Sequence, residues 1–365
     1  MAEGKLLGNA FSNPKRRLRP AISAPDRPSA VVHNLSRRIP SPVSQYEPAD
    51  DLCVVACYFN WHRYRTRARN LQVFVDSLRR SKIRLMTIEC AGMPGEFELA
   101  ESPSVIHVRS GSMAWQKERL LNILLQRVPR RYSKIAWIDA DVLFENPSWA
   151  QAASSLLQRY VVVQLFDTAV RLPPDPLYGS GLTDHYRSFG AVYQSHPQAL
   201  LNGMYEQHGH TGFAWAAQRD FLDAHGFYDA LIAGCADHLM AHAFCGDWES
   251  PCVIRTLGRG PMLDHFTNWC ERMYGDVRAR VGVVPGRLLH LWHGSVANRR
   301  YADRCNDMIK MAFNPFRDLA LNDFGCWEWS AHREDLKLWG ERYFLARRED
   351  EFFPSGSMAD GRAGF

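Results

Sequence analysis

The segment Lys134-Ile-Ala-Trp-Ile-Asp-Ala-Asp-Val-Leu-Phe144 decides the fold. Its first five residues predict a buried strand, and Asp139 and Asp141 follow directly. In open α/β folds, ligands bind at the carboxyl edge of the sheet, where these carboxylates would lie. Alternation along an extended chain would turn both to the same side, where hard oxygen ligands suit Mg²⁺ or Mn²⁺ and, through the ion, a diphosphate. The alternative is that Asp139 caps a turn and Asp141 is solvated.

The sequence around this segment predicts an α/β fold with a mostly parallel twisted sheet flanked by helices. From residue 52 onward, short apolar runs alternate with amphipathic stretches. Strands are expected at 52–59, 83–89, 105–109, 134–138, 161–166, 211–218 and 287–292, and helices at 65–80, 115–128, 148–158, 219–225, 236–244, 298–311 and 331–347. Prolines and glycines in 167–209 predict a long irregular insertion that acts as a loop or lid.

Composition divides the 365 residues into four parts. Residues 1–50 are rich in proline and hold most of the net charge of +5, which predicts a disordered basic tail. Residues 51–312 are expected to form the main domain, 313–353 a helical C-terminal extension and 354–365 a flexible tail. Because the folded part is nearly neutral, the composition argues against a fold dominated by a basic nucleic-acid footprint.

Several absences predict a cytoplasmic protein. The longest apolar runs are far shorter than the roughly 20 residues of a membrane-spanning helix. The N-terminus lacks an apolar stretch of the length that a signal peptide requires. Nine scattered cysteines without a CxxC pair predict reduced, buried thiols and argue against a structural zinc site.

A second polar segment follows a late apolar run, Leu288-Leu-His-Leu-Trp-His-Gly-Ser295. The spacing of His290 and His293 is that of a zinc pair, but an extended strand would place them on opposite faces. At most one is therefore expected to point into a given site, and we favour His293 because Gly294 follows it. The alternative for either residue is a hydrogen-bonded core histidine.

Taken together, these motifs resemble those of nucleotide-sugar-dependent glycosyltransferases of the GT-A fold, over most of residues 52–310. The matching segments occur in the family's order and are Cys57-Tyr-Phe-Asn60, Trp115-Gln-Lys-Glu-Arg-Leu-Leu-Asn122, Asp139-Ala-Asp141, Gly212-Phe-Ala-Trp-Ala-Ala-Gln-Arg219, Gly234-Cys-Ala-Asp237 and His293-Gly294. The resemblance implies that Asp139, Asp141 and His293 bind Mn²⁺ or Mg²⁺ and, through it, the pyrophosphate of the donor.

The resemblance also implies roles for residues away from the metal. Those implied to border the donor nucleotide are Cys57, Phe59, Asn60, Glu89, Lys117, Asn122, Asp139 and Ala140. Those implied for the sugar and acceptor pocket are Gly212, Phe213 and Trp215. Arg300 and Arg304, spaced i and i+4 on one expected helix face, are placed at the same pocket as contacts for the diphosphate or an anionic acceptor. Asp237 matches the acid that takes the acceptor proton in inverting members. The alternatives are a solvated helix face for Lys117, Arg300 and Arg304, core packing for the two aromatic residues and a helix N-cap for Asp237.

The resemblance implies transfer of one sugar, with inversion, from a nucleoside diphosphate sugar, with UDP as the favoured nucleotide, to a hydroxyl acceptor. No membrane insertion is expected. The acceptor is open between a glycan, a protein, a small molecule and DNA. One rival is a nucleotidyltransferase, although the first strand is not followed by the Gly-rich loop of that class. The other is a DNA-associated protein, which either glucosylates hydroxymethylated bases or binds nucleic acid without catalysis.

Overall fold

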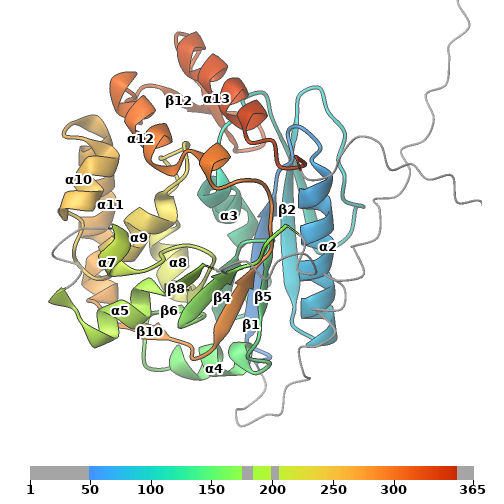
Figure 1. The fold of residues 1–365 in the computed structure, drawn as a ribbon, viewed down its shortest axis with the longest axis vertical. Coiled ribbons are helices and arrows are strands. Elements are labelled where there is room, and N and C mark those ends of the chain that lie inside the picture. Colours follow the sequence, from blue (N-terminus) through green and yellow to red (C-terminus); the bar gives the residue numbers. More distant parts are fainter. Residues whose placement is uncertain (1–48, 175–183, 199–204, 352–365) are drawn as a thin grey trace, which may run out of the picture.

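A seven-stranded sheet forms the centre of the computed structural model, which describes residues 49–174, 184–198 and 205–351 (Figure 1). In spatial order its strands are β10 (Val281–Val283), β6 (Val162–Gln164), β9 (Ala214–Gln218), β4 (Lys134–Ile138), β1 (Leu52–Tyr58), β2 (Leu85–Gly92) and β3 (Val105–Ser110). Of these, β9 runs antiparallel to both of its neighbours, and the other pairs are parallel. The predicted fold class, a mostly parallel sheet flanked by helices, is confirmed.

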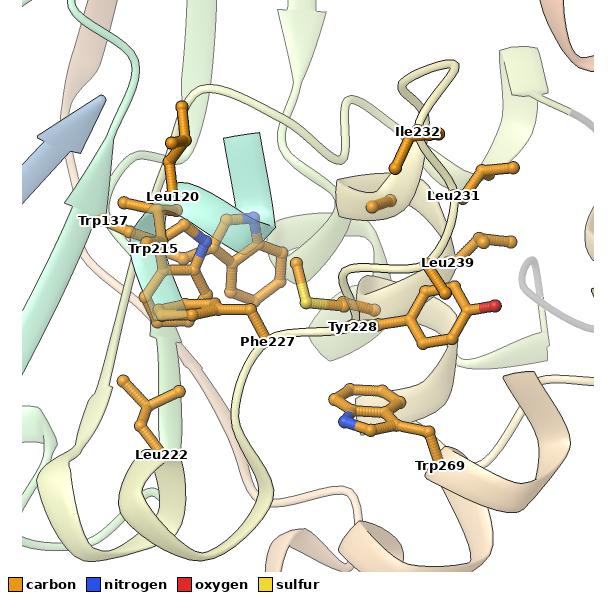
Figure 2. Packing of buried hydrophobic residues seen from close by; sticks show 14 of the residues in the cluster. Leu120, Trp137, Trp215, Leu222, Phe227, Tyr228, Leu231, Ile232, Leu239 and Trp269 are labelled. Carbon is orange, nitrogen blue, oxygen red and sulfur yellow. The ribbon is translucent and has the colours of Figure 1, made fainter. Parts of the chain in front are cut away.

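Helices cover both faces of this sheet, which explains the continuous apolar run in β1. Cys53 and Val55 pack in one core cluster with the leucines of α3 (Lys117–Leu125), whereas Val54 packs on the other face with α2 (Arg65–Arg80). Figure 2 shows part of the first cluster, in which Trp137 of β4 lies beside Trp215 of β9. Burial on two faces fixes where β1 and β4 end and therefore where the polar residues that follow them lie.

A smaller sheet lies next to the end of β4 and consists of β5 (Val142–Phe144), β11 (Arg287–His290), β7 (Thr168–Arg171) and β8 (His185–Arg187), in that order. Strand β11 pairs antiparallel with β5, so that His290 stands opposite Val142. This pairing brings residues near 141 and near 290 together, although they are far apart in the sequence. It is the link between the two polar segments of the sequence analysis.

The remaining elements surround the sheets. They are α4 (Trp149–Leu156), α5 (Phe189–Ser195), α7 (Tyr205–His208), α8 (Arg219–His225), α9 (Ala236–Phe244), α10 (Pro251–Leu257), α11 (Pro261–Val277), the 3₁₀ turn η1 (Ala297–Arg299), α12 (Tyr301–Lys310), the hairpin β12 (Leu319–Leu321) and β13 (Trp327–Trp329), and α13 (Glu334–Ala346). Within the described ranges, no helix is both long enough and apolar enough to cross a membrane. All nine cysteines lie in the described part and are free thiols.

The strands and helices predicted before residue 167 are confirmed, but three later predictions need correction. The extension 313–353 is not wholly helical, because it contains the hairpin of β12 and β13. The stretch 167–209 is not wholly irregular, because it contains β7, β8, α5 and α7, while 175–183 and 199–204 lie outside the described residues. The sequence analysis also assigned nothing to 245–286, where α10, α11 and β10 lie. Both helices begin with proline at a position that tolerates it. The two predicted tails fall almost entirely outside the described residues.

Candidate active site

A cavity of about 1010 Å³ opens at the carboxyl edge of β1 and β4. Strand β9 enters the sheet at this edge, with Ala214 opposite Ile138, so the residues before β9 reach the cavity as well. Predicted site residues that line it are Cys57, Phe59, Lys117, Asp139, Ala140, Asp141, Gly212, Phe213, Asp237, His293 and Arg304. The topology therefore brings together residues from seven separated segments of the sequence.

Asp141, His290 and His293 form a group that we call the cavity cluster. Their ligand atoms lie within 4.8 Å of one another. The Nε2 atoms of the two histidines are 3.2 Å apart, and Nε2 of His293 is 3.0 Å from Oδ2 of Asp141. The expectation that only one histidine would point here is wrong, because β11 ends at His290 and strand alternation does not continue to His293. Gly294, directly after His293, has a positive φ of 92°.

The donor set of the cavity cluster fits a divalent cation. Oδ1 of Asp141 is buried and has no hydrogen-bond partner among the described residues. Burial raises the pKa of this carboxyl, but the neighbouring His293 and His290 hold it well below its usual value, so the group is a carboxylate. One carboxylate with two imidazoles offers three ligands to an ion such as Mn²⁺ and leaves further positions for a substrate.

A buried acid from the end of the chain lies behind His293. Nδ1 of His293 is 3.7 Å from Oε2 of Glu349, and the side chain of Arg67 contacts the same carboxylate at 2.6 Å. Burial raises the pKa of Glu349, but Arg67 and Arg347 more than offset this and lower it well below its usual value. Such a partner on the far ring nitrogen orients a metal-binding imidazole. The sequence analysis missed Glu349 because it lies 56 residues beyond His293 and outside every motif.

Asp139 lies in the same cavity but has a different partner from Asp141. Its Oδ1 accepts a hydrogen bond from Nζ of Lys117 at 2.8 Å, and Lys117 is buried rather than on a solvated helix face. The two aspartates diverge because β4 ends at Ile138 and a turn follows. Glu118, next to Lys117, also lines the cavity, and its burial raises its pKa to about 8.

Asp237 stands at the start of α9 and faces Gly212. Its Oδ1 accepts a hydrogen bond from the backbone N–H of His238 at 3.0 Å. Burial raises the pKa of Asp237, but Lys117, His210 and Arg304 together lower it, so the carboxylate is ionised at neutral pH. A Cβ on Gly212 would collide with Oδ2 of Asp237, so only glycine leaves this oxygen its place.

Basic side chains add a positive field to the cavity. Six arginines line it, namely Arg67, Arg171, Arg187, Arg299, Arg304 and Arg347. Arg304 is buried and donates hydrogen bonds to Oη of Tyr343 at 3.0 Å and to Sγ of Cys235 at 3.3 Å. Its guanidinium lies 5.6 Å from the ring centre of Trp115, another lining residue. A cavity of this composition suits an anionic ligand with a ring or sugar that contacts aromatic faces.

Five predicted site residues do not line the cavity. Asn60 holds a turn through Tyr64, Glu89 accepts hydrogen bonds from the backbone of residues 98 and 99, and Asn122 contacts the backbone of Phe227. Trp215 is buried in the core against Trp137, and Arg300 pairs with Asp307 at 3.1 Å near the surface. Each of these side chains therefore has a structural partner in place of contact with the cavity.

Comparisons with known proteins were made for sequence and for structure. No protein-family model and no curated protein matches the chain. Among solved structures, mannosyl-3-phosphoglycerate synthase from Rubrobacter xylanophilus matches at 14% identity and a TM-score of 0.36, over 83% of this chain and 94% of that one. A 4-diphosphocytidyl-2C-methyl-D-erythritol synthase from Anaerococcus prevotii matches at 10% identity and a TM-score of 0.32, over 66% and 90%.

A third similar structure is a mutant of Drosophila β-1,4-galactosyltransferase 7 in complex with manganese, UDP-Gal and xylobiose. It matches at 13% identity and a TM-score of 0.27. The match covers 52% of this chain and 59% of the length of the galactosyltransferase chain. At such identities the likeness concerns the fold alone. These three partial likenesses, all at TM-scores below 0.5, do not assign the chain to a family.

Proposed function

We propose that the protein is a metal-dependent glycosyltransferase, which moves one sugar from a nucleoside diphosphate sugar, with UDP as the favoured nucleotide, to a hydroxyl acceptor with inversion. The observation that carries the proposal is the presence, in one cavity, of the cavity cluster and of Asp237, a separate ionised carboxylate. Glycosyl transfer with inversion needs both functions, because the leaving diphosphate must be stabilised and the acceptor hydroxyl must lose its proton.

Asp141, His290 and His293 would hold the metal ion, Mn²⁺ or Mg²⁺. When bound, the ion supplies Lewis-acid stabilisation of the negative charge that develops on the departing diphosphate. Arg304 and Lys117 add positive charge from the same cavity, and Asp139 holds the ammonium group of Lys117 in place. The aromatic residues Phe59 and Trp115, whose ring centres are 5.3 Å apart, offer apolar faces to the nucleoside or sugar.

Asp237 would act as the general base. Its lowered pKa keeps the carboxylate ready to accept a proton at neutral pH, and Gly212 leaves Oδ2 exposed to the cavity side. As the acceptor oxygen attacks the anomeric carbon, the hydroxyl proton passes to this carboxylate, and the bond from that carbon to the diphosphate oxygen breaks. The sugar is thereby transferred and the nucleoside diphosphate released.

The proposal is tested by thermal melting and by product release with a panel of nucleotide sugars, with and without Mn²⁺. We expect one nucleoside diphosphate sugar to raise the melting temperature only when the ion is present, because a ligand specific for the folded state stabilises it. The same mixture should release nucleoside diphosphate slowly into water. A matched pair of variants, Asp141→Asn in the cavity and Asp264→Asn on the surface of α11, separates loss of the site from a general effect of the substitution.

Two outcomes would contradict the proposal. One is a melting temperature that no nucleotide sugar changes at any metal concentration. The other is release of pyrophosphate from a nucleoside triphosphate and a sugar phosphate, which would assign the cavity to nucleotidyl transfer. Both reactions use metal-bound phosphates, and the identity of the released phosphate distinguishes them.

A further inference from the structure

A second group of metal-binding side chains lies in the helical part of the molecule. It consists of His208, His238, His242 and Cys252, all buried, and we call it the buried cluster. His208 ends α7, His238 and His242 lie one turn apart on α9, and Cys252 lies in the first turn of α10. Three helices therefore meet at this point, and none of the four residues belongs to the cavity cluster.

The four side chains already approach the geometry of a tetrahedral metal site. Their ligand atoms all lie within 4.8 Å of one another. Nε2 of His242 is 3.3 Å from Sγ of Cys252, and the three imidazole centres are 4.7 to 5.1 Å apart. With zinc bonds of about 2.0 Å to nitrogen and 2.3 Å to sulfur, neighbouring ligand atoms of a tetrahedron are separated by about 3.3 to 3.6 Å. Small side-chain shifts would close the difference.

Outer hydrogen bonds orient two of the imidazoles correctly. Nδ1 of His242 is 2.9 Å from Oδ2 of Asp247, which leaves Nε2 to face Cys252. Nδ1 of His208 is 2.8 Å from the carbonyl oxygen of Gly209, which directs the opposite nitrogen inward. Metal-binding histidines almost always carry such a carboxylate or carbonyl on the other ring nitrogen. A polar network on the protein surface would not need such partners, and both of these histidines are buried.

The alternative reading of Cys252, His242 and Asp247 is a nucleophilic thiol activated by a histidine. Two observations argue against it. Cys252 has no exposed surface and does not line the cavity; His208 and His238 do line it and stand between the cavity and the sulfur. In addition, all three imidazoles, rather than one, make contacts with this thiol. Convergence of four ligands on one buried point is typical of a closed structural site.

We propose that the buried cluster binds one zinc ion as a structural site with three histidines and one cysteine. Imidazole and thiolate ligands favour zinc over Mn²⁺ or Mg²⁺, and four protein ligands leave no open position for a substrate. On binding, Sγ of Cys252 loses its proton to solvent and the ion takes its place. The site ties α7 and α10 to α9, whose residue Asp237 directly precedes the ligand His238. This inference does not depend on the proposed function.

The test uses the full chain loaded with one metal at a time. We expect one equivalent of zinc to resist dialysis at neutral pH, and Co²⁺ in its place to give an absorption band for charge transfer from sulfur to cobalt. The cavity cluster contains no sulfur, so that band reports the buried cluster alone. Cys252→Ser should abolish the band. The control Cys270→Ser changes a buried cysteine outside the cluster, on α11, and should leave the band unchanged.

A second variant keeps the test decisive if Cys252→Ser does not fold. Asp247→Asn retains all four ligands and removes only the carboxylate behind His242, so we expect a zinc affinity about 10- to 100-fold lower. The proposal is overturned if the folded wild-type protein gives no sulfur-to-cobalt band, or if Cys252→Ser binds zinc with the wild-type affinity. If the wild-type protein gives the cobalt band but binds no nucleotide sugar, the proposed function is contradicted and the proposed zinc site is not.

Discussion

The cavity cluster and the buried cluster are two metal-binding groups of opposite design in one chain. The first has a carboxylate and two imidazoles at the wall of a large cavity, with one carboxylate oxygen still unpartnered within the described structure. The second has three imidazoles and a thiol, all buried. An incomplete set of ligands beside open space suits an ion that contacts a substrate, whereas a complete and enclosed set suits an ion that holds helices together.

The two groups also differ in what the loss of their metal ion would change. An exchangeable ion at the cavity cluster would change the reaction without changing the fold. A metal that joins three helices contributes its binding free energy to folding. Variants that remove one group and spare the other therefore provide the sharpest tests of the comparison.

The largest expected effect follows from Asp141→Asn, which removes the only carboxylate of the cavity cluster. We expect kcat for nucleotide-sugar turnover to fall by about 10³-fold, because metal stabilisation of the leaving group is worth several kcal/mol. Steady-state release of nucleoside diphosphate over a range of Mn²⁺ concentrations measures this loss. The cobalt band of the buried cluster should remain at full intensity. A variant that lost both would show that the two groups are not independent.

Asp237→Asn tests the residue that stands between the two groups, since His238 of the buried cluster follows it in the chain. We expect kcat to fall by about 10²-fold, at the lower end of the usual contribution of a general base. The nucleotide-sugar should still raise the melting temperature, because the variant keeps the metal ligands. Unchanged turnover would remove Asp237 from the mechanism, and the surface variant Asp264→Asn serves as the control.

Gly212→Ala probes the space around the same carboxylate. The added methyl group would meet Oδ2 of Asp237, which must then move. We expect kcat to fall by up to about 10²-fold, because displacement of a catalytic group by about 1 Å has costs of that size. KM for the donor should change little, which single-turnover and steady-state kinetics can distinguish. A fall in zinc content instead would mean that the shift passes through α9 to the buried cluster.

The sequence predicted the first of these groups far better than the second. The apolar strand before Asp139 located the sheet edge, and the late histidine segment was placed at the same site through the family resemblance. The expectation that only one of the two histidines would point into this site was wrong, since strand alternation ends with β11 at His290. Glu118 and Glu349 were missed, because their importance comes from burial rather than from any motif.

The buried cluster was not predicted, although the i, i+4 spacing of His238 and His242 on an expected helix was available as a signal. The absence of a CxxC pair argued against a structural zinc site, contrary to the site proposed here. Here the third and fourth ligands come from α7 and α10, in stretches that the sequence analysis took as irregular or left unassigned. Ligands contributed by separate elements become visible only when the packing of those elements is known.

Glu118→Gln tests how a residue of the cavity makes the free energy of unfolding depend on pH. The folded-state pKa of Glu118, about 8, exceeds the usual value of 4.5 because the group is buried. Between these values the unfolded chain releases a proton that the folded chain keeps, so the free energy of unfolding falls as pH rises, by about 1.4 kcal/mol per pH unit. We expect the glutamine variant to lose this slope in denaturant titrations from pH 5 to pH 8.

The buried cluster would respond to pH in the opposite direction, because protons compete with zinc for histidine and cysteine at low pH. As pH rises, zinc binding should therefore increase the free energy of unfolding of the wild-type protein, whereas the buried Glu118 should decrease it. Denaturant titrations with and without chelator separate the two contributions. If Glu118→Gln and wild type show parallel pH profiles, Glu118 is already ionised in the folded protein.

The smallest expected effect comes from Arg300→Lys, in contrast to the same change at Arg304. Arg300 is partly exposed and pairs with Asp307 near the surface, where ion pairs contribute little, so we expect kcat/KM and the free energy of unfolding to change by less than about 0.5 kcal/mol. Arg304 is buried at the cavity and makes two hydrogen bonds, to Tyr343 and Cys235, that lysine cannot reproduce in the same geometry. Its replacement should therefore raise KM for the donor, measured by initial rates, while Arg300→Lys does not. Equal effects of the two variants would mean that both guanidinium groups, and not that of Arg304 alone, contact the donor.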